Sequence, residues 1–277
     1  MKKKIISFGG PSNNYHDAVK RLCNQAKSFK IFDEIIGYTD QDLKKYPEFY
    51  NKHKIFIENN PRGYGYWIWK PYLILNELEK MEDGDILFYC DAGCELNING
   101  KEKMINFFDK VKKKSILGTK AWSNDLTHTK IDLVYFMGLN DQMELLKKPQ
   151  MQATVLLIKK DMITMTLFRE FYNICSNNYN LLDDSPSVNK SLAEFIEHRH
   201  DQSIFSLLAK KYSLLNYDLD PTCFHPNWNR GKLYPIWLIR NRTGVSFIKL
   251  FLDHPLIMTI KTLLYRGRLA NLFKITK

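Results

Sequence analysis

Two runs of consecutive apolar residues constrain the fold of this chain most. Residues 86–90 read ILFYC and residues 153–158 read ATVLLI, so an extended strand in either place would be apolar on both faces. Strands of this kind are buried on both sides, as in a parallel sheet covered by helices. Helix-like segments alternate with such runs along the chain. We therefore expect an α/β fold with a mostly parallel sheet sandwiched by helices.

Local signals set the expected elements. We expect strands at 4–8, 32–38, 54–58, 86–90, 115–119, 153–158 and 212–217. We expect helices at 15–26, 71–81, 101–114, 161–175, 190–197 and 201–212, with a mixed, partly helical stretch at 121–150. The length of 277 residues suits one large domain or one domain with an appendage.

Positive charge is concentrated near the C-terminal end. The formal charge of the chain is +11, and residues 230–277 carry +9 of it, with ten Lys and Arg and one acid, Asp253. This shift in charge is the basis for the domain boundary that we expect near residues 225–235. The expected parts are a domain at 1–232 and a basic amphipathic extension at 233–277.

The extension is also apolar along one helical face. On a helix, residues 256, 257, 260, 263 and 264 share one face, and the basic residues lie on the other. Such a helix can lie in an anionic membrane surface, or it can pack on its own domain with the basic face in water. Nucleic-acid binding is disfavoured, because no zinc-finger or RNP-like motif accompanies the charge.

Cysteine usage and hydropathy indicate the compartment. The chain has five cysteines and no CxxC pair, which favours a reducing compartment over a disulfide scaffold. The apolar stretch at 5–8 is too short for a signal peptide, and no run of about 18 apolar residues could span a bilayer. We expect a cytoplasmic protein whose extension is the candidate for contact with the inner face of the membrane.

An acid and a glycine follow the first apolar run. Asp91 stands at the expected carboxyl end of that strand, where open α/β sheets place their ligands, and Gly93 allows a close backbone approach. Mg²⁺ is commonly held by one or two carboxylates together with substrate phosphates. The alternative is an ordinary Asp-Ala-Gly turn without a ligand.

A second motif, residues 61–71, reads PRGYGYWIWKP. It places four aromatic residues and two cations within eleven residues. The cations can bind phosphates, and the aromatic faces can stack on a base or a sugar. The alternative is a loop whose Tyr and Trp side chains fill the core.

Two further segments carry polar residues. Asp201 opens an expected helix beside Arg199, so it either caps that helix or accepts a proton or a sugar hydroxyl. Residues 225–232 combine His225, an imidazole that can bind a metal, with two cations, one of them Lys232.

Taken in order, these motifs resemble nucleotide-sugar glycosyltransferases of the GT-A fold, over residues 1–232. The most specific part is GYGYWIWKP, followed after about twenty residues by the strand that ends in Asp-Ala-Gly. It is similar to a bacterial and viral glycosyltransferase-like group in which Asp-x-Gly replaces the usual Asp-x-Asp. The segments 149–154, 199–202 and 225–232 also resemble this class.

The resemblance implies roles for particular residues. The catalytic pair would be Asp201, as base or sugar contact, and Gln152, which would face the sugar. The metal ligands would be Asp91 and His225. The donor contacts would be Gly9, Gly10, Arg62, Tyr66, Trp67, Lys70, Asp91, Gly93, Arg199 and Lys232.

The resemblance also implies ligands and partners. The donor would be a UDP- or GDP-sugar, and the acceptor a glycan or glycolipid of cell-surface polysaccharide or lipopolysaccharide synthesis. A divalent cation, Mn²⁺ or Mg²⁺, would assist, although Gly93 stands where an acid is usual, and Glu95 could replace that acid only after a turn. A glycolipid acceptor would also explain an extension that binds an anionic membrane.

Two other functions fit the same residues. A nucleotidyltransferase also needs a metal held by an acid at a strand end. A nonenzymatic protein that binds membranes or polyanions would need only the basic extension. Neither the donor sugar nor retention or inversion at the anomeric carbon follows from the sequence.

Overall fold

A five-stranded mixed sheet is the centre of the protein. The computed structural model describes residues 1–219, 231–254, 256, 257 and 260. The strand order is β2-β1-β3-β6-β5, and the strands are β1 (Lys3–Phe8), β2 (Glu34–Tyr38), β3 (Ile86–Cys90), β5 (Ile116–Asn124) and β6 (Pro149–Lys159). β1 pairs in parallel with β2 and β3, whereas β6 is antiparallel to both β3 and β5. Four of the five strands therefore run the same way, and the expected α/β class is confirmed.

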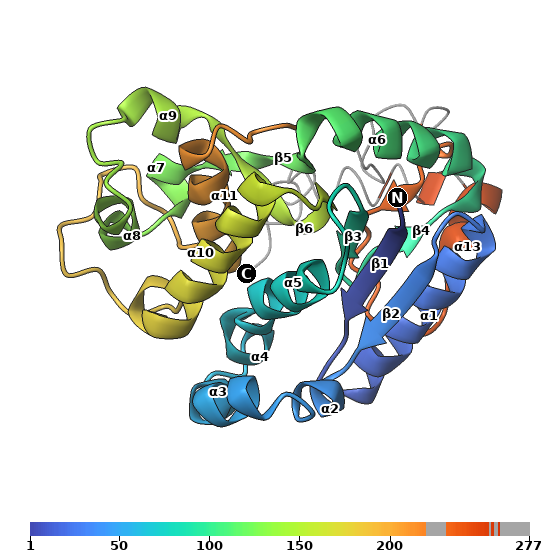
Figure 1. Ribbon diagram of the computed structural model, residues 1–277, viewed down its shortest axis with the longest axis horizontal. Helices are drawn as coiled ribbons and strands as arrows, with labels where there is room; N and C mark the ends of the chain where they lie inside the picture. The colour runs from blue at the N-terminus through green and yellow to red at the C-terminus, as the bar shows by residue number, and fades with distance from the viewer. Residues whose placement is uncertain (220–230, 255, 258–259, 261–277) are drawn as a thin grey trace, which may run out of the picture.

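The helices form a layer on each face of this sheet (Figure 1). The longer ones are α1 (Asn13–Phe29), α3 (Pro47–Asn59), α5 (Trp69–Glu79), α6 (Lys101–Lys114), α10 (Met162–Asn177) and α11 (Asp201–Lys211). The shorter ones are α2 (Asp40–Leu43), α4 (Gly63–Tyr66), η1 (Ile98–Gly100), α7 (Asp125–His128), α8 (Ile131–Phe136), α9 (Met143–Lys147), η2 (Tyr179–Leu181) and α13 (Ile248–Asp253).

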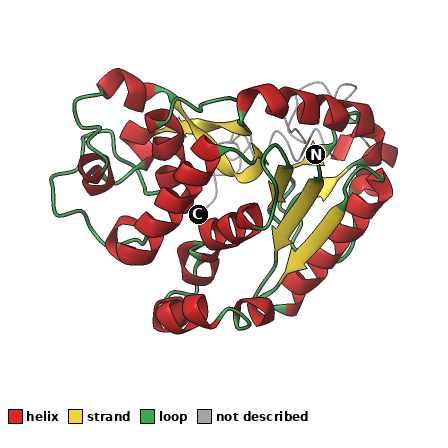
Figure 2. Cartoon of the chain, in the orientation of Figure 1, coloured by secondary structure: helices red, strands yellow, loops and turns green. Residues whose placement is uncertain are grey.

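Strand alternation places the two largest clusters of the hydrophobic core on opposite faces of the sheet. Leu87 and Tyr89 of β3 pack into one cluster with α5, α10 and α11, and Phe88 and Cys90 pack into the other with α1 and α6. Successive residues of a strand point to opposite faces, so the run ILFYC supplies both layers. Figure 2 shows the resulting arrangement, with the strands between helices.

Three expected elements are wrong. Residues 54–58 lie within helix α3 rather than in a strand, because Phe49, His53 and Ile57 recur every four residues and bury one helical face. Residues 190–197, all described, follow an irregular path rather than a helix. Residues 212–217 are also irregular, although the N–H of Gly118 donates to the carbonyl of Asn216 at 2.9 Å.

Residues 234–253 pack against the sheet domain. β7 (Ile236–Trp237) pairs antiparallel with β4 (Glu95–Leu96), and Trp237 contacts the ring of Phe251 in α13. The guanidinium of Arg21, on α1, donates to four backbone carbonyls, those of Ala92, Cys94, Asn241 and Thr243. The first part of the expected extension is therefore tied to α1 and to the segment after β3.

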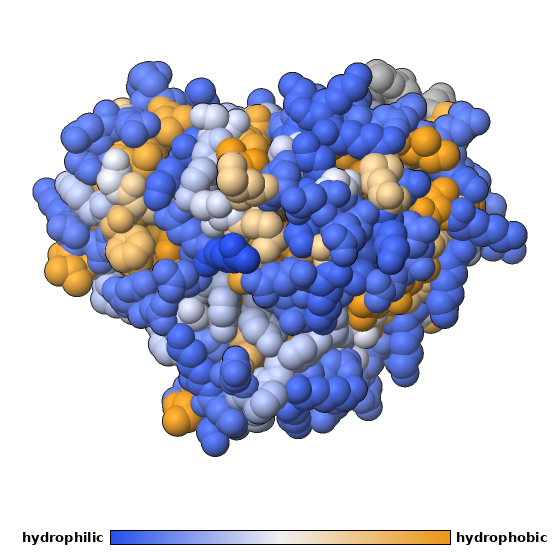
Figure 3. All heavy atoms as spheres, viewed as in Figure 1, coloured by the Kyte–Doolittle hydropathy of each residue, from blue (hydrophilic) through white to orange (hydrophobic). Residues whose placement is uncertain are grey.

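Hydrophilic residues cover most of the face shown in Figure 3, and apolar residues appear there as separate patches. Within the described part of the chain, every helix falls short of the length or apolar character needed to cross a bilayer.

Candidate functional site

One lysine joins two carboxylates at the carboxyl ends of the parallel strands. Asp91 directly follows β3, and Lys70 and Asp201 lie in the first turns of α5 and α11. The Nζ of Lys70 lies 2.6 Å from Oδ2 of Asp201 and 3.5 Å from Oδ1 of Asp91. The same ammonium donates to the carbonyl of Ala153 at 3.2 Å. The aromatic motif and the Asp-Ala-Gly turn, well separated in the sequence, meet at this point.

Burial differs among the three charged groups. Lys70 and Asp201 are buried, whereas the side chain of Asp91 is 31% exposed and so faces solvent. Burial alone would lower the pKa of Lys70, but the nearby Asp201 and Asp91 carboxylates outweigh burial and raise it. The ammonium is therefore held in its charged form.

Asp201 is subject to opposing influences. Burial raises the pKa of its carboxyl group and Asp91 adds to the rise, while the ammonium of Lys70 opposes both. The net direction is upward, so Asp201 holds a proton more readily than an exposed aspartate does. A carboxylate with a raised pKa, beside a second carboxylate that is partly exposed, is an arrangement suited to acid–base chemistry.

Tyr89 belongs to the site, although the sequence analysis did not include it. Its hydroxyl donates to Oδ1 of Asp91, and the Lys70 ammonium lies 5.3 Å from the centre of its ring. The sequence could have indicated Tyr89, because side chains alternate along a strand and residues 89 and 91 therefore share one face. Tyr89 and Lys70 together fix the orientation of the Asp91 carboxylate.

Other predicted residues lie at the same edge of the sheet. Gly9 and Gly10 follow β1, which pairs in parallel with β3, so they leave the sheet on the same side as Asp91. A Cβ on Gly9 would lie 2.1 Å from the carbonyl oxygen of Tyr15, so only glycine fits there. Gln152 lies on β6 near this edge, where its Oε1 accepts a hydrogen bond from Thr119 at 3.0 Å.

The aromatic loop, which we define as residues 61–67, forms a left-handed turn before α5. The φ angles of residues 63–67 are all positive, from +50° at Tyr66 to +80° at Gly65. Tyr66 and Trp67 lie against the imidazole of His200, with ring centres 4.8 and 5.6 Å away. His200 also has a positive φ, 53°, and directly precedes Asp201. The loop is therefore packed against the residue before the buried aspartate.

Three predicted donor contacts have other partners or surroundings in the structure. The guanidinium of Arg199 lies 2.5 Å from Glu197, and both side chains are exposed. The carbonyl of Gly93 accepts a hydrogen bond from the N–H of Asn241, and a Cβ there would make only ordinary contacts. Lys232 is exposed, and its carbonyl accepts from Asn97. His225 lies outside the described residues.

Glu95 does not take the place of the missing second acid. It is buried in β4, where its carboxylate accepts hydrogen bonds from Gln25, Asn241, Ser246 and the N–H of Phe247. These contacts tie β4 to the segment after β7. The chain after Gly93 does not bring Glu95 to Asp91, because it continues into β4.

The described residues provide little to bind a divalent cation. Over the described ranges, no three His, Cys, Asp or Glu side chains come together in a group that could hold a metal ion. Tyr89 and Lys70 engage Oδ1 of Asp91, and no described residue donates a hydrogen bond to its Oδ2. One carboxylate oxygen fits Mg²⁺ or Mn²⁺ only as part of a shell completed by phosphates and water.

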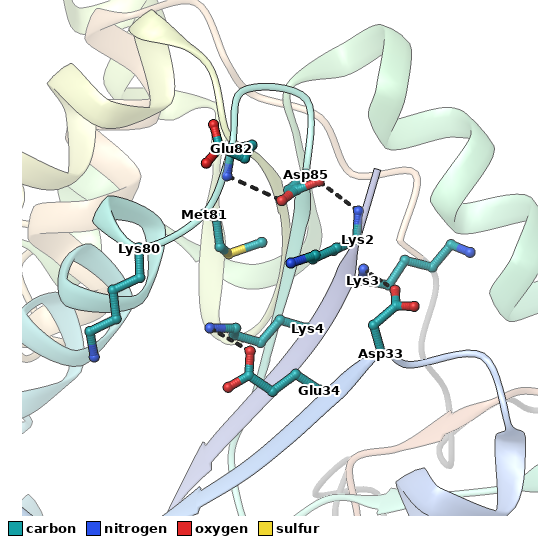
Figure 4. A pocket seen from close by; sticks show the side chains of 9 residues that line it. All are labelled: Lys2, Lys3, Lys4, Asp33, Glu34, Lys80, Met81, Glu82 and Asp85. Carbon is teal, nitrogen blue, oxygen red and sulfur yellow. Dashed lines mark hydrogen bonds and ion pairs between the residues drawn. The ribbon is translucent and has the colours of Figure 1, made fainter.

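A pocket of about 260 Å³ opens at the opposite edge of the sheet (Figure 4). It lies beside the starts of β1, β2 and β3, and its lining includes Lys4, Glu34 and Lys80. The ammonium of Lys4 bonds Glu34 and Glu77, each at 2.8 Å, and Lys80 also bonds Glu77. Its paired charges give this pocket no surplus of one sign for a charged ligand.

The fold and the site together define a class: an α/β protein with a lysine-linked carboxylate pair at the carboxyl ends of its parallel strands. No family model and no curated protein matches the chain.

Solved structures with a similar course of the chain include a glycosyltransferase involved in the glycosylation of the major capsid of PBCV-1. It has 10% identity over 72% of this chain and 81% of that chain, with a TM-score of 0.39. Mouse xyloside xylosyltransferase 1 has 10% identity over 89% of this chain and 100% of that chain, with a TM-score of 0.46. The 4-diphosphocytidyl-2C-methyl-D-erythritol synthase of Anaerococcus prevotii has 9% identity over 73% of this chain and 88% of that chain, with a TM-score of 0.33. Similarity at this level assigns no activity.

Proposed function

We propose that this protein is a glycosyltransferase that moves a sugar from a nucleoside diphosphate to a glycan or glycolipid acceptor. The observation that carries the proposal is the Lys70 ammonium between Asp91 and Asp201, at the sheet edge where α/β proteins bind nucleotides. The aromatic loop and the glycines after β1 border the same edge. The GT-A resemblance of these motifs supplies the reaction class.

Asp91 would face the donor diphosphate. Departure of a nucleoside diphosphate develops negative charge on the phosphate oxygens, which nearby cations stabilise. A divalent cation held between Asp91 and the phosphates, with His225 as a further ligand, would supply part of that charge. Tyr89 and Lys70 hold the Asp91 carboxylate in one orientation by their contacts with Oδ1.

Asp201 and Gln152 would act on the sugars. If the anomeric configuration inverts, Asp201 takes the proton from the acceptor hydroxyl, a role that its raised pKa favours. If the configuration is retained, the leaving phosphate takes that proton, and Asp201 binds hydroxyls of the donor sugar. Gln152, on the neighbouring strand β6, would contact the sugar in either case.

A donor screen tests this proposal. Thermal unfolding is measured with UDP- and GDP-sugars, with and without Mn²⁺ or Mg²⁺. Donor hydrolysis is measured as the amount of nucleoside diphosphate released. A donor that stabilises the protein and is hydrolysed supports the proposal. In a parallel assay with a nucleoside triphosphate and a sugar phosphate, release of pyrophosphate would indicate a nucleotidyltransferase instead. NMR of the product anomer then decides between retention and inversion.

Asp91→Asn tests the assigned residue. The variant keeps the side-chain shape but loses the negative charge that would bind a divalent cation beside the donor phosphates, so transfer should fall by about a hundredfold or more. Glu79→Gln is the matched control, because it removes one negative charge from the far end of α5, about 14 Å along the helix from Lys70. Unchanged turnover of Asp91→Asn would remove Asp91 from the mechanism.

The C-terminal extension supports a second function, contact with an anionic membrane. Leu256 and Ile260 are 75% and 53% exposed, and residues 230–277 carry a charge of +9. Exposed apolar residues among cations are typical of helices that lie in a membrane surface. In an enzyme with a glycolipid acceptor, this contact would bring the site to the membrane. In a nonenzymatic protein, it would be the whole function.

A further inference from the structure

Asp184 links the aromatic loop to the segment before α11. Its Oδ2 accepts a hydrogen bond from the Tyr66 hydroxyl at 2.9 Å and lies 2.8 Å from Nη1 of Arg62. Its Oδ1 lies 3.6 Å from Nε2 of His200, the residue before Asp201. One carboxylate therefore contacts two residues of the loop and faces the residue next to the buried site.

The loop needs such contacts to hold its shape. Tyr64, Tyr66 and Trp67 have positive φ angles, which non-glycine residues adopt only at an energetic cost. Two hydrogen bonds to the Gly63 carbonyl close the turn, one from the N–H of Trp67 in the loop and one from the indole of Trp69 in α5. Asp184 adds an attachment from outside the loop, and it acts on the side chains that carry the proposed ligand contacts.

The ion pair between Arg62 and Asp184 is open to competition. The two side chains are 51% and 45% exposed, and ion pairs between exposed groups are weak because water screens them. A phosphate group carries more charge than a carboxylate and can accept two hydrogen bonds from one guanidinium. A phosphate that reaches Arg62 can therefore displace Asp184 from it.

His200 provides no substitute hydrogen bond for Asp184. Its Nδ1 donates to the carbonyl of Leu182 at 2.8 Å, so the ring proton is on Nδ1 in the neutral form. Burial lowers the pKa of His200 and favours that form. Its Nε2 has no hydrogen-bond partner among the described residues, and in the neutral ring it cannot donate one. Arg62 and Tyr66 are thus the donors that hold Asp184.

We propose that Asp184 is a positioning residue of the donor site, which holds Arg62 and Tyr66 in the free protein and yields Arg62 to a donor phosphate. That this phosphate belongs to a sugar donor rests on the proposed function. The competition itself requires only the Arg62 guanidinium, the Asp184 carboxylate and a phosphate group. Asp184 would then reduce the affinity for phosphates while keeping the loop in its binding shape.

Calorimetric titration with inorganic pyrophosphate, and separately with uridine diphosphate, tests the proposal. Asp184→Asn keeps the shape and an oxygen that accepts hydrogen bonds, but it removes the charge that competes for Arg62. We expect it to bind pyrophosphate about two- to fivefold more tightly than the wild type. Arg62→Gln in the Asp184→Asn background should abolish that gain. A purely structural role of Asp184 would not produce a gain that depends on Arg62.

Glu79→Gln is the matched control. Glu79 forms an exposed ion pair with Arg169, whose side chains are 50% and 63% exposed, and the substitution changes the net charge by the same amount. An equal gain in this variant would show a general charge effect and overturn the proposal. No gain in Asp184→Asn, or a gain that survives the loss of Arg62, would overturn it as well.

The outcome is distinguishable from failure of the proposed function. Sugar transfer by the wild type is measured in a separate assay with intact donors. An Arg62-dependent gain in a protein that transfers no sugar supports the role of Asp184 in phosphate binding and rejects the glycosyltransferase. If the wild type transfers sugar but Asp184→Asn does not bind pyrophosphate more tightly, the glycosyltransferase function stands and the competition between Asp184 and phosphate is rejected.

Discussion

Lys70 and Asp201, each in the first turn of a different helix, form a buried ion pair with Nζ and Oδ2 2.6 Å apart. The pair joins the start of α5 to the start of α11, and through Asp91 it also reaches the end of β3. Two helices and a strand are thus connected by one cation at the edge of the sheet.

Lys70→Met should destabilise the protein by about 3–5 kcal/mol, because it leaves the buried Asp201 carboxylate without its cation. The free energy of unfolding, measured by urea denaturation, checks this. Lys70→Met combined with Asp201→Asn should recover part of the loss, since it removes the charge that has become unpaired. A loss below about 1 kcal/mol in the single variant would show that the pair contributes little to stability.

Alanine substitutions at two glycines with positive φ distinguish the cost of backbone strain from the cost of a steric clash. Gly84 has φ +89° and open space where a Cβ would be, so Gly84→Ala should cost about 1 kcal/mol from strain alone. Gly65 has φ +80°, and a Cβ there would lie 2.7 Å from Ile57. Gly65→Ala should therefore cost about 1–3 kcal/mol more, as urea denaturation measures. Equal losses in the two variants would contradict the packing of the aromatic loop on α3.

The stability should fall in mild acid because of His53. This residue is buried against Tyr172 and Tyr179, and its burial lowers the pKa from 6.5 to about 4. Between these two values the unfolded chain binds a proton that the folded protein does not, so the free energy of unfolding decreases as the pH falls from 6.5 to about 4.

His53→Gln removes this titration and retains a side chain that can hydrogen-bond. The difference in unfolding free energy between the wild type and the variant should shrink across the same interval, as urea denaturation at a series of pH values shows. The same pH dependence in both proteins would assign the effect to other groups, such as the buried His198, whose pKa burial lowers to about 3.

Membrane contact should depend on the exposed apolar residues of the extension. Leu256→Ser combined with Ile260→Ser should weaken binding to vesicles that contain anionic lipid by about a hundredfold or more, because burial of both side chains is lost. Co-sedimentation of the full chain with vesicles measures this, and added salt should weaken binding of the wild type. Ile55→Ser, at an exposed isoleucine of α3 outside the extension, is the control. Equal binding by all three proteins would exclude this surface.

Elements with strong local signals were predicted well. The helix expected at 101–114 forms over Lys101–Lys114, and the run ILFYC forms β3 over Ile86–Cys90. Short apolar runs were less informative, because a helix of suitable spacing buries them equally well. Residues 54–58 show this, since they belong to α3 and not to a strand. The reversed direction of β6 also had no local signal.

The positions of the candidate residues were predictable one at a time. Asp91 stands at a strand end and Asp201 at a helix start, as their neighbours in the sequence indicated. Their link through Lys70 was not predictable, and neither was the contact of Asp184 with Arg62 and Tyr66. The motif around Lys70 predicted a contact with phosphate, whereas in the structure its ammonium already neutralises two carboxylates.

The sequence by itself determined the α/β class, the buried central strands and the kinds of charged group available at their ends. These properties depend on side-chain periodicity over a few residues, which each segment carries regardless of its partners. Only the tertiary structure decided which charges meet, because contacts between distant segments depend on how helices and strands pack together. Lys70 contacts Asp201 because α5 and α11 cover the same face of the sheet. No local sequence pattern encodes this arrangement of the two helices.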